Sequence, residues 1–412
     1  MKASFCATAL ALVLLACGSE SGEASTPVVG TVTSPIIKGE MDTAAHDSVI
    51  LLQIMSQGQL LGSCTGTLVA PNLVLTARHC VSDTAEGMIC NIDGTAEEGG
   101  AIKKDFSPSS LYVYTGTNAR YFQNSTDKAA ARGKAIITET SEVLCNRDIA
   151  FLVLDRDVNM PTSAVRTKSG AVENENLTMV GWGLVESGKL PAYRQVRTGV
   201  PVAAAGPLKF AEDTNIGLGD SEFAVQESIC SGDSGGPAFS EKGAVIGVVS
   251  RGGGGPDSDT NRASNCVGAD VINVYTELVK KSALVTKAFG AAGYTPRDEG
   301  VTAGVPKGSE CSTDAQCATQ QCVAGTCVGR CDEAAGAACT ADATCTDKDA
   351  VKVCLTQLQI SALKGEDKAS TDGDSGGCAA APGRTDPAGG ILVGLALVAL
   401  GGRVVRRRRG DR

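Results

Sequence analysis

Residues 230–239 constrain this chain most, because their glycines and proline favour a tight loop directly before the apolar run 244–249. Ser234 lies in that loop between an aspartate and two glycines, whose small size keeps the space before its hydroxyl open. Such a loop can point consecutive N–H groups into one hollow, which suits an oxyanion. A serine hydroxyl is a weak nucleophile without a base, and the base needs an orienting group. The loop therefore directs the search to a histidine and an acid.

The chain has only two histidines. His79 directly follows a short apolar run, and Asp148 stands at the start of another. His46 has no comparable surroundings and is interpreted as a surface residue. The candidate base, orienting acid and nucleophile are therefore His79, Asp148 and Ser234.

Short apolar runs recur with Gly, Pro and Asn between them, which indicates an all-β sandwich or barrel. Leu278, Val285 and Phe289 follow at helical spacing and predict one helix near residue 285. The only tryptophan, Trp182, is interpreted as a packing residue. The expected strands lie at 49–55, 66–70, 111–114, 135–138, 149–154, 177–180 and 244–249.

Three segments resemble the catalytic blocks of the chymotrypsin/trypsin-like serine peptidase family, namely TARHC at 76–80, RDIAFLVL at 147–154 and CSGDSGGP at 230–237. Their order along the chain is the family's order and differs from the orders in subtilisins and α/β-hydrolases. The resemblance covers about residues 36–289. It implies an all-β, chymotrypsin-like double β-barrel with a C-terminal helix.

The resemblance also implies the chemistry. The expected activity is that of a serine endopeptidase that forms an acyl-enzyme on Ser234, with His79 transferring the proton and Asp148 orienting the imidazole. The backbone N–H groups of Gly232 and Ser234 would form the oxyanion hole. The alternatives are a catalytically inactive relative that serves as a binding module, and a surface adhesion protein that acts through a cysteine-rich module.

A zymogen is expected, because Ile36 matches the family's mature N-terminus, whose freed amine pairs with the acid before the nucleophile, here Asp233. Two residues depart from the family pattern. Lys38 replaces a glycine, and Pro35 precedes the cut where relatives activated by trypsin carry Arg or Lys. The activating protease is therefore not expected to be trypsin. The alternative is that residues 36–37 simply form the first strand.

The pocket that would bind the side chain before the cleaved bond has Ser228 at its base, where Lys- or Arg-binding relatives have an aspartate. Glu227 is one residue out of register, so it is a weak substitute, and Ile229 and Asn273 would narrow the pocket. Arg251 replaces the family's usual tryptophan. A small or apolar residue before the cut is expected. The residues assigned to substrate binding are Ser228, Ser250, Gly252 and Asn273.

Seventeen cysteines and 50 glycines suggest an exported, disulfide-stapled protein. The resemblance implies the bridges Cys64–Cys80 and Cys230–Cys266, and it leaves Cys90 and Cys145 to pair with each other. Eight more cysteines between 311 and 354 mark a module too small to build a core, with its connectivity left open. No metal or cofactor is expected, since that region has neither histidines nor CxxC pairs.

The two ends of the chain resemble sorting signals. Residues 1–17 are similar to a bacterial export signal with a lipobox, which implies a lipoprotein modified at Cys17; ordinary signal cleavage is the alternative. Residues 378–412 resemble a MYXO-CTERM sorting tail that is processed near Cys378; a plain anchor helix is the alternative. A second GDSGG segment at 373–377 lacks a following strand and is interpreted as linker.

These features predict an exported protein of the bacterial cell envelope or cell surface, with release outside the cell as the alternative. Its expected partners are a peptide or protein substrate, an activating protease and a membrane. The net charge of −9 argues against nucleic acid. The predicted parts are a signal peptide with lipobox at 1–17, a propeptide at 18–35, a trypsin-like protease domain at 36–290, a linker at 291–310, a cysteine-rich module at 311–354, a second linker at 355–377 and a sorting or anchor tail at 378–412.

Overall fold

The structure is a computed structural model that describes residues 36–364, apart from 123–125, 257, 259, 302–303 and 332–337. The predictions for the signal peptide with Cys17, for the propeptide and for the tail with Cys378 lie outside the described residues. The second GDSGG segment also lies outside them. Among the helices that the structure describes, none is both long and apolar enough to cross a membrane.

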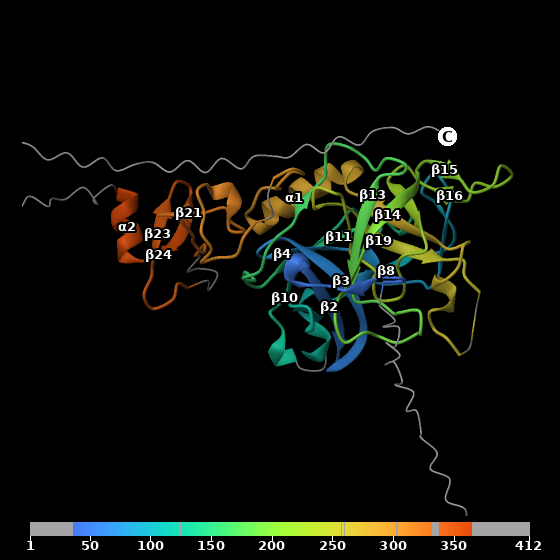
Figure 1. Cartoon of the computed structure of the whole chain (residues 1–412), viewed down its shortest axis with the longest axis horizontal. Helices are drawn as coiled ribbons and strands as arrows, with labels where there is room; N and C mark the ends of the chain where they lie inside the picture. Colours follow the sequence, from blue (N-terminus) through green and yellow to red (C-terminus); the bar gives the residue numbers. More distant parts are fainter. Residues whose placement is uncertain are drawn as a thin grey trace, which may run out of the picture. The chain divides into compact units, whose positions relative to one another are not determined.

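Six antiparallel strands close into a first β-barrel in the order β10-β11-β4-β3-β2-β9 (Figure 1). In β2, Ile50 and Leu52 belong to the barrel core, whereas Val49 and Leu51 pack in two other clusters. Successive side chains of a strand face opposite ways, so this continuous apolar run is buried on both faces. The strands are β2 (Val49–Ser56), β3 (Gln59–Ala70), β4 (Leu73–Thr76), β9 (Leu111–Tyr114), β10 (Ala131–Ile137) and β11 (Ala150–Leu154).

A second barrel follows along the chain, because β14 pairs with both β13 and β17 and closes the ring β14-β13-β18-β19-β20-β17. Its core includes Met179 and the stacked rings of Phe223 and Tyr275, whose centroids are 5.1 Å apart. The strands of this sheet are β1 (Glu40–Met41), β12 (Ala164–Val165), β13 (Asn176–Gly181), β14 (Gln195–Ala205), β17 (Glu222–Gln226), β18 (Pro237–Phe239), β19 (Ala244–Gly253) and β20 (Ile272–Glu277).

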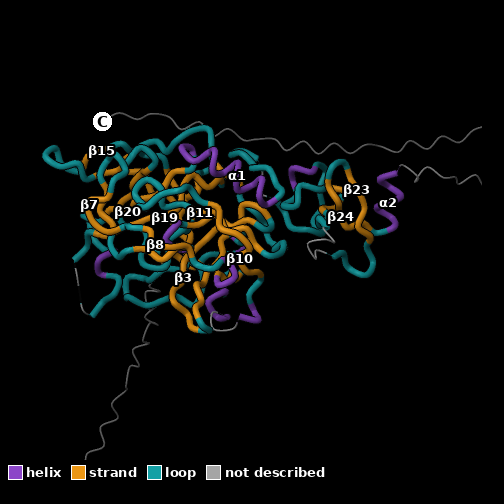
Figure 2. Tube along the Cα trace, turned by 180° about the vertical axis from the view of Figure 1, so that it is seen from behind, coloured by secondary structure: helices purple, strands orange, loops and turns teal. Residues whose placement is uncertain are grey.

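The helix after the second barrel, α1 (Ser282–Ala292), packs against β4 and β11 of the first barrel (Figures 1 and 2). It ends at Gly293, whose φ of 77° is the left-handed conformation that glycine adopts without strain. Leu278 lies before the helix begins, so the prediction that it shares a helix face with Val285 and Phe289 is wrong, although all three belong to one cluster. The predicted double β-barrel with a C-terminal helix is confirmed.

Shorter elements decorate the two barrels. Three two-stranded sheets are formed by β5 (Ser82–Thr84) with β8 (Ile102–Asp105), β6 (Met88–Cys90) with β7 (Ala96–Gly99), and β15 (Leu208–Lys209) with β16 (Gly217–Leu218). The 3-10 helices of this part are η1 (Ala44–His46), η2 (Arg78–Cys80), η3 (Pro108–Ser110), η4 (Ala119–Phe122), η5 (Thr126–Lys128), η6 (Ser264–Cys266) and η7 (Val279–Lys281).

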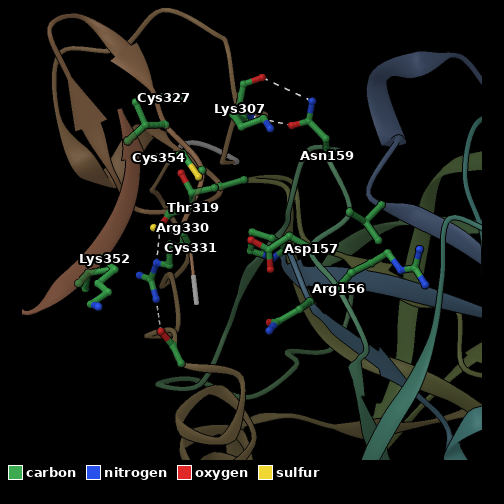
Figure 3. A pocket seen from close by; sticks show the side chains of 18 of the residues that line it. Arg156, Asp157, Asn159, Lys307, Thr319, Cys327, Arg330, Cys331, Lys352 and Cys354 are labelled. Atoms are coloured by element: carbon green, nitrogen blue, oxygen red, sulfur yellow. Dashed lines mark hydrogen bonds between the residues drawn. The ribbon is translucent and has the colours of Figure 1, made fainter. Parts of the chain in front are cut away.

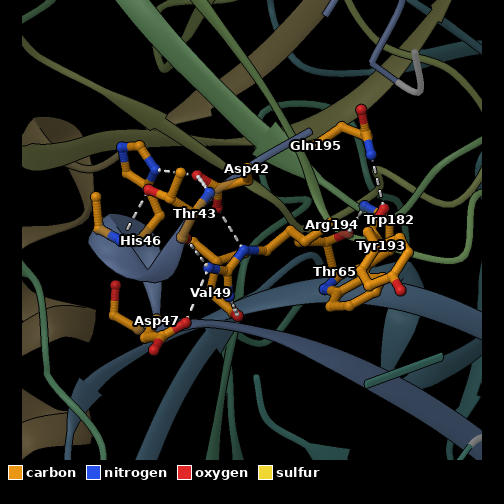
Figure 4. A network of polar contacts seen from close by, with 12 residues as sticks. Asp42, Thr43, His46, Asp47, Val49, Thr65, Trp182, Tyr193, Arg194 and Gln195 are labelled. Atoms are coloured by element: carbon orange, nitrogen blue, oxygen red, sulfur yellow. Dashed lines mark hydrogen bonds and ion pairs between the residues drawn. The ribbon is translucent and has the colours of Figure 1, made fainter. Parts of the chain in front are cut away.

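A buried arginine fixes the start of the described chain (Figure 4). Arg194 is completely buried, and its guanidinium donates to Asp42 Oδ2 (2.6 Å) and to the carbonyl of Val49 (2.7 Å). Asp42 also accepts from the Nδ1 of His46 at 2.7 Å, and the His46 ring stacks on Phe239. His46 thus lies at the surface with 28% of its side chain exposed, but it is bonded and stacked there, which its sequence surroundings did not indicate.

The cysteine-rich region contains two small hairpins, a 3-10 helix and a helix. They are β21 (Cys322–Val323) with β22 (Thr326–Cys327), β23 (Thr344–Lys348) with β24 (Val351–Leu355), η8 (Asp314–Gln316) and α2 (Gln357–Lys364). Among the described residues of this region, the hydrophobic cluster that includes Val323, Val353 and Leu355 is small, so disulfides supply most of the constraint. The bridges are Cys311–Cys322, Cys317–Cys327, Cys331–Cys345 and Cys339–Cys354.

The segment expected as the first linker is hydrogen-bonded on both sides. The carbonyl of Arg297 accepts from the N–H of Val165 (2.8 Å), and Gly304 exchanges two backbone bonds with Thr162. The guanidinium of Arg297 donates to the carbonyl of Cys317 (2.9 Å) and so reaches the cysteine-rich region. Arg297 and Gly304 thus pair with the backbone of residues 162–165 in the protease domain.

A groove of about 1240 Å³ lies between the cysteine-rich region, the turn after β11 and the end of α1 (Figure 3). Asn159 and the backbone N–H of Lys307 are joined across it by a bond of 2.8 Å. The guanidinium of Arg330 lies 3.9 Å from the centre of the Tyr294 ring, and it donates to the carbonyl of Thr319 at 3.0 Å. None of the three candidate triad residues lines this groove.

Candidate functional site

His79 lies in the 3-10 helix η2, directly after strand β4 of the first barrel. The disulfide Cys64–Cys80 and a bond from Arg78 Nε to Ser82 Oγ (2.8 Å) fix the residues on either side of it. The side chain of His79 keeps 23% of its surface exposed. The local structure therefore holds the backbone of the histidine and leaves part of its ring accessible.

Asp148 is completely buried directly before strand β11 and contacts His79 twice. Its Oδ1 accepts from the backbone N–H of His79 (3.0 Å), and its Oδ2 lies 2.8 Å from the Nδ1 of the ring. The hydroxyl of Ser250 donates to the same Oδ2 at 2.8 Å. Because an ionised carboxylate only accepts, Nδ1 of His79 carries the proton and Nε2 keeps a lone pair.

Two opposing effects act on each member of this pair. Burial lowers the pKa of His79, but the charge and hydrogen bond of Asp148 raise it more strongly, so the pKa lies above its ordinary value of 6.5. Burial raises the pKa of Asp148, but His79 and the donors around the carboxylate outweigh it, so the pKa lies below 3.8. The pair thus keeps Asp148 ionised and favours the imidazolium that a proton-transferring base must form.

The loop that carries Ser234 packs against the segment that carries the histidine. The carbonyl of Ser234 accepts from the N–H of Thr65 (2.9 Å) and lies 3.6 Å from the Sγ of Cys80, the residue after the histidine. Gly235 approaches Thr76 so closely that a Cβ on the glycine would lie 2.1 Å from Thr76 Oγ1. The φ of Gly235 is +76°. A side chain at position 235 is excluded by both the contact and the left-handed backbone.

The backbone N–H groups of the serine loop fall into two sets. Those of Asp233, Gly235 and Gly236 donate to carbonyls of the loop itself and of strand β19. Those of Gly232 and Ser234 donate to no residue that the structure describes. Gly232 has a φ of +105°, and its carbonyl accepts from the hydroxyl of Thr65 at 2.9 Å. The loop therefore leaves two nearby donors available to an anionic group.

Asp233 is completely buried behind this loop and holds its shape. Its Oδ1 accepts from the N–H of Gly183 (2.7 Å), and its Oδ2 accepts from that of Cys230 (2.9 Å). Burial raises the pKa of Asp233 to about 6, against these bonds and the charge of Arg120, which lower it. Arg120 itself donates to the carbonyl of Trp182, the residue before Gly183.

Ile36 and Ile37 are completely buried, and the carbonyl of Ile37 accepts from the guanidinium of Arg197 at 2.9 Å. The first strand of the described chain begins at Glu40, so the alternative that residues 36–37 form a strand is wrong. Lys38 has a φ of +60°, a conformation that favours glycine. The glycine that the resemblance implies at this position would adopt this conformation without strain.

The ammonium of Lys38 forms an ion pair with Glu227, whose other carboxylate oxygen accepts from the N–H of Gly268 at 3.0 Å. Glu227 is therefore engaged by the segment after Ile37. Both carboxylate oxygens of Glu227 therefore already have partners within the protein.

Ser228 and Asn273 meet at the predicted base of the specificity pocket. Asn273 Nδ2 lies 3.3 Å from the Ser228 hydroxyl and donates to the carbonyl of Gln226 at 3.0 Å. Its Oδ1 is buried without a hydrogen-bond partner among the described residues, and a Cβ on Gly252 would lie 2.0 Å from it. Asn273 thus reaches across to the glycine. Ile229 belongs to the core of the second barrel, with its Cδ1 near Gly252.

Six of the protease cysteines form the disulfides Cys64–Cys80, Cys90–Cys145 and Cys230–Cys266. Cysteine clusters beside His79 and in the cysteine-rich region have ligand-like spacing, but each of their sulfurs is part of a disulfide. A disulfide sulfur is not the thiolate that binds a metal. These clusters therefore act as covalent braces.

One acidic residue near the site was not anticipated from the sequence. Glu222 is buried at the start of β17 and forms an ion pair with Arg251, with Arg251 Nη1 2.6 Å from Glu222 Oε1. A glutamate in an otherwise apolar strand is a signal of a buried partner, but nothing local identifies that partner. The two residues are brought together only by the closing of the second barrel.

The sequence model of the trypsin family matches residues 37–275, which is more than half of the chain. Similar proteins include seminase of Drosophila melanogaster, 26% identical over 46% of this chain and 62% of that protein, thus under two thirds of its length. Serine protease SSP1 of Scolopendra subspinipes is 23% identical over 50% of this chain and 68% of that protein. Human kallikrein-4 is 26% identical over 63% of this chain and 89% of that protein. Among solved structures, the mouse brain serine protease neuropsin matches with 17% identity and a TM-score of 0.42, over 61% of this chain and 99% of that one.

Proposed function

The chain belongs to the trypsin family of serine proteases, and on that basis we propose that it is an exported serine endopeptidase acting through His79, Asp148 and Ser234. The observation that carries the proposal is the bonded pair of His79 and Asp148, lying next to a serine loop with two available N–H donors. A base with an oriented imidazole, a nucleophile and an oxyanion site are the three parts that acyl transfer requires.

The reaction proceeds in two halves. Ser234 Oγ attacks the carbonyl carbon of the peptide bond while Nε2 of His79 takes its proton. The C–N bond then breaks, the amine leaves with that proton, and the acyl group remains on Ser234 as an ester. Water attacks the ester with His79 again as base, the acid product leaves, and the proton returns to Ser234. Asp148 keeps the imidazole in the required tautomer and stabilises its cation.

The negative charge that develops on the carbonyl oxygen would be received by the N–H groups of Gly232 and Ser234. One such donor lowers the barrier by about 2.7–4 kcal/mol when it is already in place. The bonds of Asp233 to the N–H groups of Cys230 and Gly183 keep the loop in the shape that exposes both donors. Order in this loop is therefore a condition for activity.

This mechanism predicts the pH dependence of kcat/KM. The rate should rise with pH with a midpoint above 6.5, because only neutral His79 accepts a proton and Asp148 raises its pKa. Asp148→Asn should move the midpoint to lower pH and reduce kcat about 10⁴-fold. Steady-state kinetics between about pH 5 and pH 9 measure both quantities.

The matched control for this prediction is Asp42→Asn, because Asp42 bonds the other histidine, His46, at 2.7 Å. This control should leave the midpoint of the rate profile unchanged. A midpoint in Asp148→Asn at or above that of the unaltered enzyme would contradict the assigned role of the Asp148 charge.

We further propose that the enzyme is made as a zymogen that is cut before Ile36. Pro35 precedes this bond, so the activating protease recognises something other than a basic residue. Lipidation at Cys17 and sorting at Cys378 would place the protein at the bacterial cell envelope or surface. The disulfides of the protease domain and the cysteine-rich region suit an oxidising compartment outside the cytoplasm.

The proposed substrate has a small or apolar side chain before the cleaved bond. Ser228 offers no negative charge, and Asn273 narrows the space toward Gly252. Purified protein beginning at Ile36 should take one fluorophosphonate adduct, on Ser234, and should cleave a peptide library with little preference for Lys or Arg. Absence of the adduct would favour the inactive relative, and a strong Arg or Lys preference would refute the pocket assignment.

A variant sharpens this test. Asn273→Gly should increase kcat/KM for a large apolar side chain relative to a small one by roughly tenfold, since pocket volume discriminates at about that scale. A change at Ile272, which is exposed and next to it in the same strand, serves as the control. Equal profiles for Asn273→Gly and the unaltered enzyme would show that Asn273 does not line the pocket.

A further inference from the structure

The carboxylate of Glu222 is saturated with hydrogen bonds inside the second barrel. Its two oxygens accept from Nη1 and Nη2 of Arg251 at 2.6 and 2.9 Å, in a bidentate ion pair. Oε1 also accepts from the N–H of Asn146 (3.2 Å), and Oε2 accepts from the N–H of Gly219 (3.0 Å). The residue is 2% exposed. A buried charge with four donors is arranged to fix the groups around it.

One of these donors belongs to the turn that leads to the catalytic acid. Asn146 stands two residues before Asp148 and has a φ of +61°, a left-handed conformation that asparagine adopts more readily than most residues. Its side-chain Oδ1 accepts from the N–H of Ser221 at 3.2 Å, so the asparagine is bonded on two sides to the segment before β17. The preceding residue, Cys145, is bound covalently to Cys90.

The second connection runs through strand β19. Arg251 directly follows Ser250, whose hydroxyl donates to Asp148 Oδ2 at 2.8 Å. The pairing of β19 with β20 shifts between Val249 and Arg251, so Ser250 sits at an irregularity that re-aims its side chain. The ion pair with Glu222 fixes the residue next to this irregularity. Two of the supports of Asp148 are therefore attached to one buried carboxylate.

We propose that Glu222 is a positioning residue for the catalytic centre: by holding Asn146 and Arg251 together, it fixes the carboxylate of Asp148 against His79. This role rests on the triad of the proposed function. It also gives Arg251 a structural role. The guanidinium of Arg251 is paired with Glu222, so it does not select acidic substrates.

The test replaces Glu222 with glutamine, which keeps its size and removes its charge. With histidine labelled at Cε1, the chain gives two NMR signals, from His79 and His46. Glu222→Gln should lower the titration midpoint of His79 by about one pH unit and leave that of His46 unchanged. It should reduce kcat about 10- to 100-fold with little change in KM, since the substrate contacts remain.

Two further variants separate positioning from other causes. The pair Glu222→Gln with Arg251→Met keeps the net charge of the unaltered protein, so the low His79 midpoint and low kcat should persist if position is what matters. Glu175→Gln breaks a similar bidentate pair, with Arg166, and should affect stability without moving either histidine signal. Arg251→Met alone covers the case in which Glu222→Gln does not fold; it should shift the His79 midpoint in the same direction.

If the His79 midpoint and kcat both returned to their original values in the double variant, the loss in Glu222→Gln would be due to charge, and the proposal would be overturned. An unchanged His79 midpoint in the variants that fold would overturn it as well. The NMR titration does not depend on turnover. An enzyme without peptidase activity would therefore refute the proposed function while the titration still decided the role of Glu222.

Discussion

Replacing Ser234 with alanine should reduce kcat about 10⁶-fold, the largest loss that we expect from any single change in this chain. Without Oγ no acyl-enzyme can form, and His79 and Asp148 cannot compensate because they act only through that nucleophile. A residual rate of about 10³- to 10⁴-fold over water should remain from binding and the oxyanion site. Cleavage of a small-residue peptide, followed by mass spectrometry, measures the loss.

The chain supplies its own control for this prediction. Ser375 lies in the second GDSGG segment, outside the described residues, and its surroundings in the sequence lack a following apolar strand. Ser375→Ala should leave kcat and KM unchanged. Loss of activity in that variant, or normal activity in Ser234→Ala, would refute the assignment of the nucleophile.

Asp233→Asn should leave cleavage before Ile36 intact and still abolish most of the activity. In the chain with the bond before Ile36 unbroken, burial raises the pKa of Asp233 to about 6, so its charge is unfavourable at neutral pH. A freed amine at Ile36 would add a countercharge beside that of Arg120 and so stabilise the ionised Asp233 that holds the serine loop. Removing one partner of such a buried pair costs about 3–5 kcal/mol, which corresponds to roughly 10²- to 10⁴-fold in rate.

The measurement combines N-terminal sequencing with kinetics. Asp233→Asn should begin at Ile36, free of any lipid on Cys17, because no cysteine between 18 and 35 can keep the pieces joined. Asp157→Asn is the control, since Asp157 is another carboxyl whose pKa is raised by burial but lies beside Tyr294. An active enzyme that still begins at Cys17 would rule out this activation mechanism.

The raised pKa of Asp233 also predicts how the free energy of unfolding of the uncut chain changes with pH. The folded state holds a proton on Asp233 more tightly than the unfolded state does, because the folded pKa is about 6 and the ordinary value is 3.8. This contribution to the free energy of unfolding is therefore greatest below about pH 4 and is lost as the pH rises through 6. Pairing with a freed amine would remove this loss at neutral pH.

Much of the fold could be predicted from the sequence, because its signals are local. An apolar run such as 49–55 between turn residues forms a strand in any context that buries it. The segments around His79 and Ser234 carry their own conformations, through a 3-10 turn and through glycines at positive φ. Local sequence therefore indicated both the strands and the short segments that hold the site residues.

What could not be predicted depends on partners far apart in the chain. Glu222 lies 29 residues from Arg251 and 76 from Asn146, and no pattern in the sequence links the three. The stacking of His46 on Phe239 is of the same kind. Leu278 has the spacing of a helix residue, but the helix begins only after the 3-10 turn at Val279–Lys281. Periodicity identifies the buried side of a segment better than its ends.

The backbone bonds of Arg297 to Val165 and of Gly304 to Thr162 bear on where an expression fragment of the protease domain should stop. The family match ends at 275 and helix α1 at Ala292, yet a fragment cut at either point would strip the backbone partners from the connection between the two barrels. A fragment that keeps these backbone bonds extends at least to Gly304. The last residues of such a fragment therefore come from the segment that the sequence predicts to be a linker.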